Sequence, residues 1–159
     1  MRTNAGVTIE FVGPDQADVV RDLMRAAFSE YDAVLTVPSS SMWETVKDVA
    51  GHIAAGGAVL ASVGADPVGS GRFALREDHV YIGRLSVLPS HRGRGVGAAM
   101  MLAMEQRAVT EGRTEARISV RTKLPKNIEL YERLGYLVTA RYQHERGSEV
   151  VVDLAKQLL

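Results

Sequence analysis

The stretch that most constrains this chain runs from Val80 to Met104 and reads VYIGRLSVLPSHRGRGVGAAMMLAM. Apolar and aromatic residues recur at a near period of two over 80–87, which predicts a β-strand. Pro89 breaks that run, and glycines then follow at alternate positions before helix-forming residues begin. The order of these signals predicts a strand, a tight glycine turn and a helix over 96–110.

The glycine turn, with Gly93, Gly95 and Gly97, predicts a site for an anion. Glycine lets a backbone approach a ligand closely and adopt conformations that are closed to other residues. The first turn of a helix has unpaired N–H groups and partial positive charge, which favour phosphate, and Arg92 and Arg94 add full charges. The spacing differs from that of a P-loop and from the dinucleotide fingerprint. The alternative is a plain strand-to-helix connection with solvated arginines.

Composition excludes several kinds of function. Lys+Arg and Asp+Glu are equal at 19 each in 159 residues, which gives no support for binding to nucleic acid or a membrane surface. The chain has no cysteine, which excludes disulfides, cysteine nucleophiles and thiolate metal sites. The start of the chain lacks the apolar core of a signal peptide, and no apolar run approaches membrane-spanning length. We expect one domain over 1–159, a cytoplasmic location and no metal.

The rest of the chain alternates between strand and helix patterns. Period-two runs predict further strands at 7–12, 58–63, 68–75, 116–121, 136–142 and 149–154. Helical spacing predicts one helix after Asp15, its expected N-cap, a second helix after a capping box of Ser41 and Glu44, and a short helix over 126–134. The helix over 96–110 is apolar nearly all round, which predicts that it is well buried. It joins two strands that are expected to pair in parallel, so the fold class is mixed α/β.

The glycine turn also matches a family signature. Arg92-Gly93-Arg94-Gly95-Val96-Gly97 fits the pattern Arg/Gln-x-x-Gly-x-Gly/Ala, with Leu85-Ser86-Val87 and Pro89 upstream of it. On these residues the chain resembles the GNAT superfamily of acetyl-CoA-dependent N-acetyltransferases. The resemblance implies that the signature cradles the pyrophosphate of coenzyme A, and that backbone groups of Leu85, Ser86 and Val87 hold the pantetheine arm. It also implies a twisted, mostly antiparallel sheet of about seven strands, splayed at the parallel pair and flanked by about four helices.

A second motif lies between Asn127 and Tyr136. Its tail, Leu-Tyr-x-x-x-Gly-Tyr, resembles the GNAT segment in which a tyrosine lies near the acyl-CoA sulfur, and that tyrosine is Tyr131 here. A phenol can protonate the departing sulfur, and the alternative is that Tyr131 only packs the short helix on the sheet. The family's usual asparagine, seven residues before the tyrosine, is replaced by Leu124. Asn127 is therefore assigned to the cofactor site with less support.

The acceptor side is less well defined. Some family members carry a glutamate on the central strand as a base, but this chain has Arg84 there. Candidate bases are Glu30, Asp32, Glu44 and His144. Each is expected rather as a solvated surface residue, and water-relayed deprotonation is equally open, so no base is assigned. Residues that could line an acceptor pocket are Tyr31, Trp43, Arg72, Arg84 and Tyr142, with the arginines favouring a substrate that carries carboxylate or phosphate. The alternative is that Trp43 is a hydrophobic anchor and Arg72 is solvated.

The resemblance implies transfer of an acetyl group from acetyl-CoA directly to a primary amine of a small molecule or peptide, in a ternary complex. The sequence leaves two alternatives open. One is a non-catalytic acyl-CoA-binding or regulatory module of the same fold, which would bind the cofactor without turnover. The other is a nucleotide-phosphate-binding protein that shares only the glycine turn. A homodimer is compatible with the family, but nothing in the chain decides it.

Overall fold

The computed structural model describes residues 6–29, 40–145, 147 and 149–158. Its strands are β1 Val7–Val12, β2 Gly57–Val63, β3 Asp66–Leu75, β4 Val80–Val87, β5 Glu115–Arg121, β6 Leu137–Gln143 and β7 Val150–Gln157. Its α-helices are α1 Ala17–Phe28, α2 Val46–Ala55, α3 Val96–Thr110 and α4 Pro125–Arg133, and the 3-10 helices are η1 Pro14–Gln16, η3 Ser40–Trp43 and η4 Pro89–His91.

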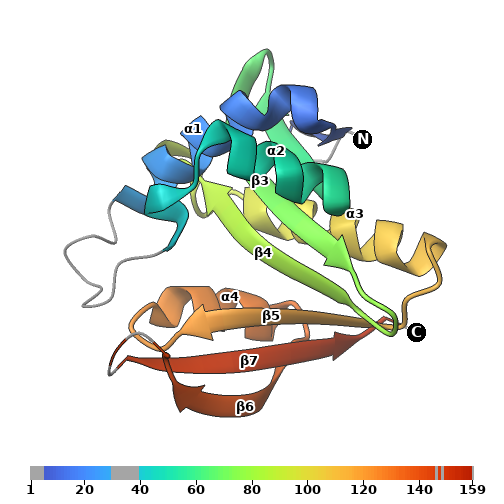
Figure 1. Cartoon of the computed structure of the whole chain (residues 1–159), viewed down its shortest axis with the longest axis vertical. Helices are drawn as coiled ribbons and strands as arrows, with labels where there is room; N and C mark the ends of the chain where they lie inside the picture. The colour runs from blue at the N-terminus through green and yellow to red at the C-terminus, as the bar shows by residue number, and fades with distance from the viewer. Residues whose placement is uncertain (1–5, 30–39, 146, 148, 159) are drawn as a thin grey trace.

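The strands form one seven-stranded sheet in the order β1-β2-β3-β4-β5-β7-β6. β4 and β5 are parallel, and the other neighbouring pairs are antiparallel. The parallel pairing covers only Val80 with Ala116 and Tyr81 with Arg117. Beyond these residues the two strands diverge, as Figure 1 shows between β4 and β5. The predicted mixed α/β fold, with a mostly antiparallel sheet splayed at one parallel pair, is confirmed.

Helices cover both faces of the sheet (Figure 1). Alternate residues of β2 show how the core divides, because side chains of a strand point to opposite faces. Val59 and Ala61 belong to a cluster with the methionines of α3 and with residues of α4, whereas Ala58 and Leu60 pack with α1 and α2. The larger cluster is on the α3 side, so α3 is the central helix of the core.

The burial predicted for α3 is only partly correct. Met100, Met101 and Met104 are buried, but Leu102 and Val109 are exposed. A helix that packs on one face of a sheet keeps a solvent side even when apolar residues occupy it. Among the described residues, no helix is long and apolar enough to span a membrane.

The two predicted helix starts are wrong. Asp15 lies within η1, and α1 begins at Ala17 with no side-chain cap. Pro14 explains this, because proline suits the first position of a helical turn and starts η1 before Asp15 can cap.

The capping box of α2 is formed by Thr45 and Asp48, whereas Ser41 lies in η3. The Asp48 N–H donates to the Thr45 hydroxyl at 3.1 Å, and the Thr45 N–H donates to the Asp48 carboxylate at 2.9 Å. This is the same reciprocal pattern four residues later in the chain. As a result, Glu44 stands just outside the helix and its side chain is available for another role.

Candidate active site

The turn between β4 and α3 is built by backbone conformation. Gly93 has φ 74° and Gly95 has φ 81°, in the left-handed region that other residues rarely adopt. Gly95 is the N-cap of α3, with no side-chain cap on the first-turn N–H groups. A Cβ at Gly93 or Gly95 would meet nothing within 4 Å, so the turn faces open space. A 15-residue helix that presents its first N–H groups to open space can bind an anion.

A cavity of about 460 Å³ extends from this turn along β4 and the inner side of α4. We call it the glycine-turn groove. Its lining includes nearly all the residues predicted for cofactor binding and catalysis: Leu85, Ser86, Val87, Arg92, Gly93, Gly95, Val96, Gly97, Asn127 and Tyr131. Arg94, also predicted there, is exposed and lies outside the lining. The structure thus brings together two motifs that are separated by about 30 residues of chain.

Arg92 has a structural role in addition to its position in the groove. Its Nε donates to the carbonyl oxygen of Val87 at 3.0 Å, and a terminal nitrogen donates to the carbonyl oxygen of Ala27 at 3.1 Å. Burial lowers the pKa of the Arg92 guanidinium from its ordinary value. The side chain therefore ties the end of α1 to the end of β4 at one wall of the groove.

The splayed edge of β4 offers backbone groups to the groove. The Leu88 N–H donates to Val68 on β3 at 2.9 Å. Successive backbone groups of a strand point to alternate sides, so the N–H of Val87 points away from β3, toward the gap left by β5. An extended ligand with amide groups can pair with such an edge.

β4 also contains an irregularity at Arg84. Gly83 pairs with Arg72 and Ser86 pairs with Ser70, so Arg84 and Leu85 together face a single residue of β3. Arg84 has φ 52°, and no other non-glycine residue in the described part of the chain has positive φ. A bulge of this kind redirects side chains, and bulges are frequent beside active sites.

A smaller cavity of about 140 Å³ lies between the splayed strands. We call it the passage. Leu85, Asn127 and Tyr131 line both the passage and the groove. Arg84 and Ser119 line both the passage and a third cavity on the other side. The three cavities therefore follow one another through the opening between β4 and β5.

The two tyrosines of the second motif occupy different environments. Tyr131 lines the groove and the passage, and its ring packs edge-on against Tyr136 at 6.1 Å between centroids. Tyr136 is fully buried, and its hydroxyl donates to the Glu105 carboxylate at 2.7 Å. Lys156 donates to the other oxygen of Glu105 at 2.9 Å. Burial, and then the bond to Glu105, raises the pKa of Tyr136 well above its usual range. Of the two phenols, Tyr131 lines the cavities and Tyr136 does not.

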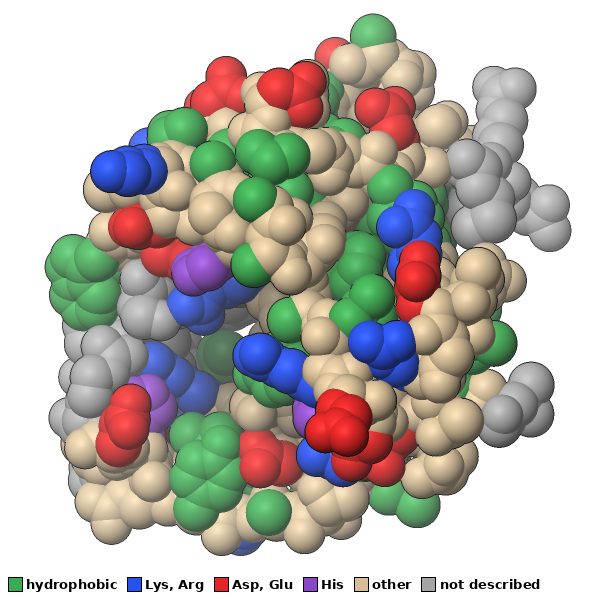
Figure 2. Space-filling view, turned by 45° about the vertical axis from the view of Figure 1, so that its right-hand side comes forward, with side chains coloured by type: hydrophobic (Ala, Val, Ile, Leu, Met, Phe, Trp, Pro, Cys, Tyr) green, Lys and Arg blue, Asp and Glu red, His purple; other side chains and the backbone are tan. Residues whose placement is uncertain are grey.

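The third cavity measures about 530 Å³ and is lined by residues of α2, β3 and β4. We call it the arginine pocket. Figure 2 shows a hollow on this side of the molecule with basic and histidine side chains around it. Its charged lining residues are Glu44, His52, Arg72, Arg76 and Arg84.

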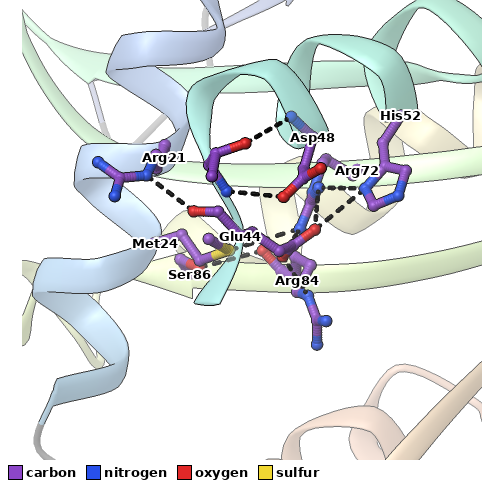
Figure 3. A network of polar contacts seen from close by, with 9 residues as sticks. Arg21, Met24, Glu44, Asp48, His52, Arg72, Arg84 and Ser86 are labelled. Carbon is purple, nitrogen blue, oxygen red and sulfur yellow. Dashed lines mark hydrogen bonds and ion pairs between the residues drawn. The ribbon is translucent and has the colours of Figure 1, made fainter. Parts of the chain in front are cut away.

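Glu44 is the centre of a polar network in this pocket (Figure 3). One carboxylate oxygen accepts from Arg72 at 2.7 Å and from Arg84 at 3.1 Å, and the other accepts from Arg72 at 3.1 Å. The His52 Nδ1 lies 3.0 Å from Glu44 and 2.9 Å from Arg72. Burial alone would raise the pKa of Glu44, but the bonds and charges of Arg72, and then Arg84, hold it below its usual range. At neutral pH Glu44 is thus an anion and a poor proton acceptor.

Several expectations for the acceptor side are corrected by this network. Glu44 and Arg72 are 8% and 6% exposed, so neither is a solvated surface residue. Trp43 is 62% exposed, so it is not a hydrophobic anchor. Arg72 and Arg84 do line the pocket, whereas Trp43 does not.

The remaining acceptor-side candidates lie elsewhere. Tyr142 is on β6, where its hydroxyl donates to Asp153 at 2.9 Å, and His144 follows in the hairpin loop. Neither residue lines the three cavities. Glu30, Tyr31 and Asp32 fall outside the described residues.

The sequence analysis missed His52 and Ser119 as pocket residues. Nothing in their local sequence marks them, because α2 and β5 reach the pocket only through the tertiary fold. His52 sits in the last turn of α2, and Ser119 donates to Asp153 at 2.7 Å from the diverging part of β5.

Comparisons with known proteins agree with this geometry. A family model described as the acetyltransferase (GNAT) family matches residues 18–136. The chain is 33% identical over 75 residues to YjcF of Bacillus subtilis (strain 168), an uncharacterized N-acetyltransferase, and the match covers 47% of this chain and 51% of YjcF. The chain thus spans about half of the length of this curated relative.

Solved structures extend the similarity to the whole fold. A Lactobacillus plantarum protein, provisionally described as an N-acetyltransferase, is 27% identical with a TM-score of 0.75, covering 97% of this chain and 99% of that chain. YncA of Salmonella typhimurium, provisionally described as an acetyltransferase and solved with its cofactor acetyl-CoA, is 16% identical with a TM-score of 0.73, covering 96% and 94%. At that identity the second likeness shows the fold alone.

Proposed function

Because the chain belongs to the GNAT acetyltransferase family, and is therefore an acyltransferase, we propose that it transfers an acetyl group from acetyl-CoA directly to a primary amine. The acceptor is a small molecule or a peptide, and donor and acceptor are bound together in a ternary complex. The observation that carries this proposal is the series of three adjoining cavities, which runs from the glycine turn through the splayed strands to the arginine pocket.

The groove fits coenzyme A chemically. A diphosphate suits the N-terminus of α3, where Gly95 leaves the first N–H groups uncapped and facing open space. An amide-bearing pantetheine arm suits the side of β4 at Leu85 and Val87 that pairs with no neighbouring strand. Acetyl-CoA supplies an activated acetyl group at the end of that arm, so the reacting carbonyl would lie near the passage.

Two groups of this chain are proposed to act on the reaction. The backbone N–H of Val87, or a neighbouring donor on β4, stabilises the oxygen that becomes negative as the amine attacks. The phenol of Tyr131 donates its proton to the sulfur that leaves as the carbon–sulfur bond breaks, and the proton that the attacking amine loses passes to solvent water. Both groups lie along the groove, on β4 and α4 respectively.

A direct route is favoured over a covalent enzyme intermediate. The chain has no cysteine, so the commonest acyl-carrying nucleophile is missing. The groove and the arginine pocket share the passage as a boundary, which lets a donor and an acceptor approach one another from opposite sides of the splay. Direct attack therefore needs no movement of the acyl group onto the protein.

The test is release of free coenzyme A thiol from acetyl-CoA in the presence of a panel of primary amines, with acetylated product identified by mass. We expect amine-dependent thiol release by the wild-type protein. Matched tertiary amines serve as the control, because they cannot give a stable acetylated product. Tight acetyl-CoA binding with no amine-dependent release would instead support the non-catalytic module.

A further inference from the structure

The arginine pocket carries an excess of positive charge. Among the residues that the structure describes, its charged lining comprises Arg72, Arg76 and Arg84 against the carboxylate of Glu44, with His52 beside them. The carbonyl end of α2 borders the pocket at Ala55 and Gly56, and it offsets only about half a charge. The side nearest the passage, where Arg84 lies, therefore stays cationic.

Glu44 does not make the pocket a site for a cation. Both of its oxygens already accept from guanidinium groups, at distances between 2.7 and 3.1 Å. The carboxylate is also largely buried, with 10% of its side chain exposed. A protonated amine in the pocket would meet arginines before it met this carboxylate.

Among the three arginines that line the pocket, Arg84 is the one that also lines the passage. Its Nε is fixed on Glu44, and in Figure 3 its two terminal nitrogens point away from Glu44. Its side chain is 32% exposed, whereas that of Arg72 is 7% exposed. The planar guanidinium fork matches the geometry of a carboxylate or phosphate group.

The backbone of β4 is distorted where Arg84 stands. A positive φ at a non-glycine residue is strained and persists where the surrounding structure imposes it. Here the bulge opposite Gly71 sets that conformation and directs the side chain into the cavities. Arg72 fixes Glu44, and Glu44 in turn fixes Arg84, so Arg72 is a positioning residue.

We propose that the acetyl acceptor is a primary amine that also carries an oxyanion group, carboxylate or phosphate, which Arg84 binds. This inference rests on the proposed function, since it names the acceptor class of the same site. Arg84 lines both the arginine pocket and the passage, and Tyr131 lines the passage as well. Because both residues line the passage, an acceptor whose oxyanion binds Arg84 has its amine near Tyr131. The two groups are therefore close together, as they are in a small molecule.

The experiment measures kcat/KM for acetylation of three matched series. These are aminoalkyl carboxylates, aminoalkyl phosphates, and the corresponding uncharged carboxamides and alcohols of equal chain length. We expect at least a tenfold higher kcat/KM for one anionic series than for its uncharged counterpart, since a hydrogen bond to a charged group is stronger than one to a neutral group. The series that shows the preference tells carboxylate from phosphate.

Three variants test whether Arg84 carries the preference. Arg84→Gln is expected to reduce the anionic preference to within about threefold, and Arg84→Lys to keep part of it, because lysine retains the charge without the fork. Arg141→Gln on β6 is the matched control, because this arginine is exposed and lies outside the pocket lining. Acetyl-CoA affinity, measured in parallel, is expected to be the same in all three variants.

Each outcome separates this inference from the proposed function. If acetyl-CoA binds and amines are acetylated without preference for an anionic group, or if no anionic amine is acetylated, the inference is overturned while the cofactor site stands. A preference that survives in Arg84→Gln also overturns it. If acetyl-CoA does not bind at all, the proposed function itself fails.

Discussion

The glycine-turn groove and the arginine pocket lie on either side of the same splay in the sheet, yet they differ in whether backbone or side-chain groups form them. The groups expected to hold the ligand in the groove are mainly backbone: left-handed glycines, the first turn of α3 and the edge of β4 that diverges from β5. The pocket is made of charged side chains, with Glu44, Arg72 and Arg84 linked across 28 and 40 residues of sequence.

Because of this difference, mutations in the groove and in the pocket should change different properties, ligand binding in the first and stability in the second. Backbone groups at an open turn can be blocked without disturbing the core, because the turn faces space rather than neighbours. Buried charges depend on each other, since removal of one partner leaves the other unpaired in a poorly solvated place. Changes in the groove should therefore act mainly on ligand binding, with only local backbone strain or relief added to stability, whereas changes in the pocket should strongly affect folding.

The largest expected effect is on the pocket. Glu44→Ala leaves Arg72, which is 6% exposed, without its counter-charge, and we expect a loss of about 3–5 kcal/mol in the free energy of unfolding measured in urea. Glu115→Ala is the control, because it removes an ion pair with Arg117 that is more exposed. That control should lose less than about 1 kcal/mol. Equal losses in the two variants would contradict the account of the pocket.

Next in size is a change in the groove. Gly95→Glu places a carboxylate where the helix N-terminus is expected to bind pyrophosphate, and we expect acetyl-CoA affinity to fall by about 100-fold, which is about 2.7 kcal/mol. Gly112→Glu is a matched control, because Gly112 also has positive φ (84°) and open space around its Cβ, but follows the other end of α3. Loss of affinity in both variants would point to strain rather than to the anion site.

Tyr131→Phe tests the chemistry at the boundary between the two regions. Removal of the phenol is expected to lower kcat by about 10²-fold, with acetyl-CoA affinity unchanged, because the ring still packs against Tyr136. Tyr142→Phe, on β6 outside the cavities, should leave kcat unchanged. Normal turnover in Tyr131→Phe would return this residue to a packing role.

Low pH should lower the stability of the protein through the arginine pocket rather than through the groove. The folded-state pKa of Glu44 is depressed below its ordinary value of 4.5, so the unfolded state binds the proton more readily. The stability contributed by Glu44 is therefore complete above about pH 4.5 and is lost as pH falls through the lower, folded-state value. Unfolding in urea at a series of pH values should show a steeper loss in acid for the wild type than for Glu44→Gln. Parallel profiles would contradict this.

The smallest effect distinguishes the glycines from one another. A Cβ at Gly97 would make only ordinary contacts, at 3.6 Å from Leu130 and Leu85, so Gly97→Ala should bind acetyl-CoA normally and gain up to about 1 kcal/mol in stability. Gly93→Ala, at φ 74°, should instead lose about 1–2 kcal/mol. Thermal unfolding and titration of both variants check the pair.

The sequence predicted those parts of the molecule that depend on local pattern. The bounds of β4 and α3 agree with the predicted ranges 80–87 and 96–110. Strand alternation and the shift to helix-forming residues at Val96 are both visible in the local sequence of this segment. The β4 and α3 sides of the groove follow from the same segment, because glycine spacing and helix polarity decide their form, whereas α4 supplies the remaining side.

The local sequence pattern predicted the wrong start for α2, because two candidate capping boxes follow one another in the chain. Ser41 with Glu44 and Thr45 with Asp48 both fit a capping box, and only the second is used. The choice is consistent with a contact made elsewhere, since Glu44 binds Arg72 on β3. A single sequence gives no measure of that pairing, so the start of α2 and the network around Glu44 were beyond prediction, although Arg72 and Arg84 were named as candidate pocket residues.

The most direct test of the central claim is calorimetric titration of the wild-type protein with acetyl-CoA, beside ATP and NAD. The account predicts selective binding of acetyl-CoA, since the groove joins an anion site to an open strand edge for an amide-bearing arm. Equal binding of all three ligands, or no binding of acetyl-CoA, would contradict it.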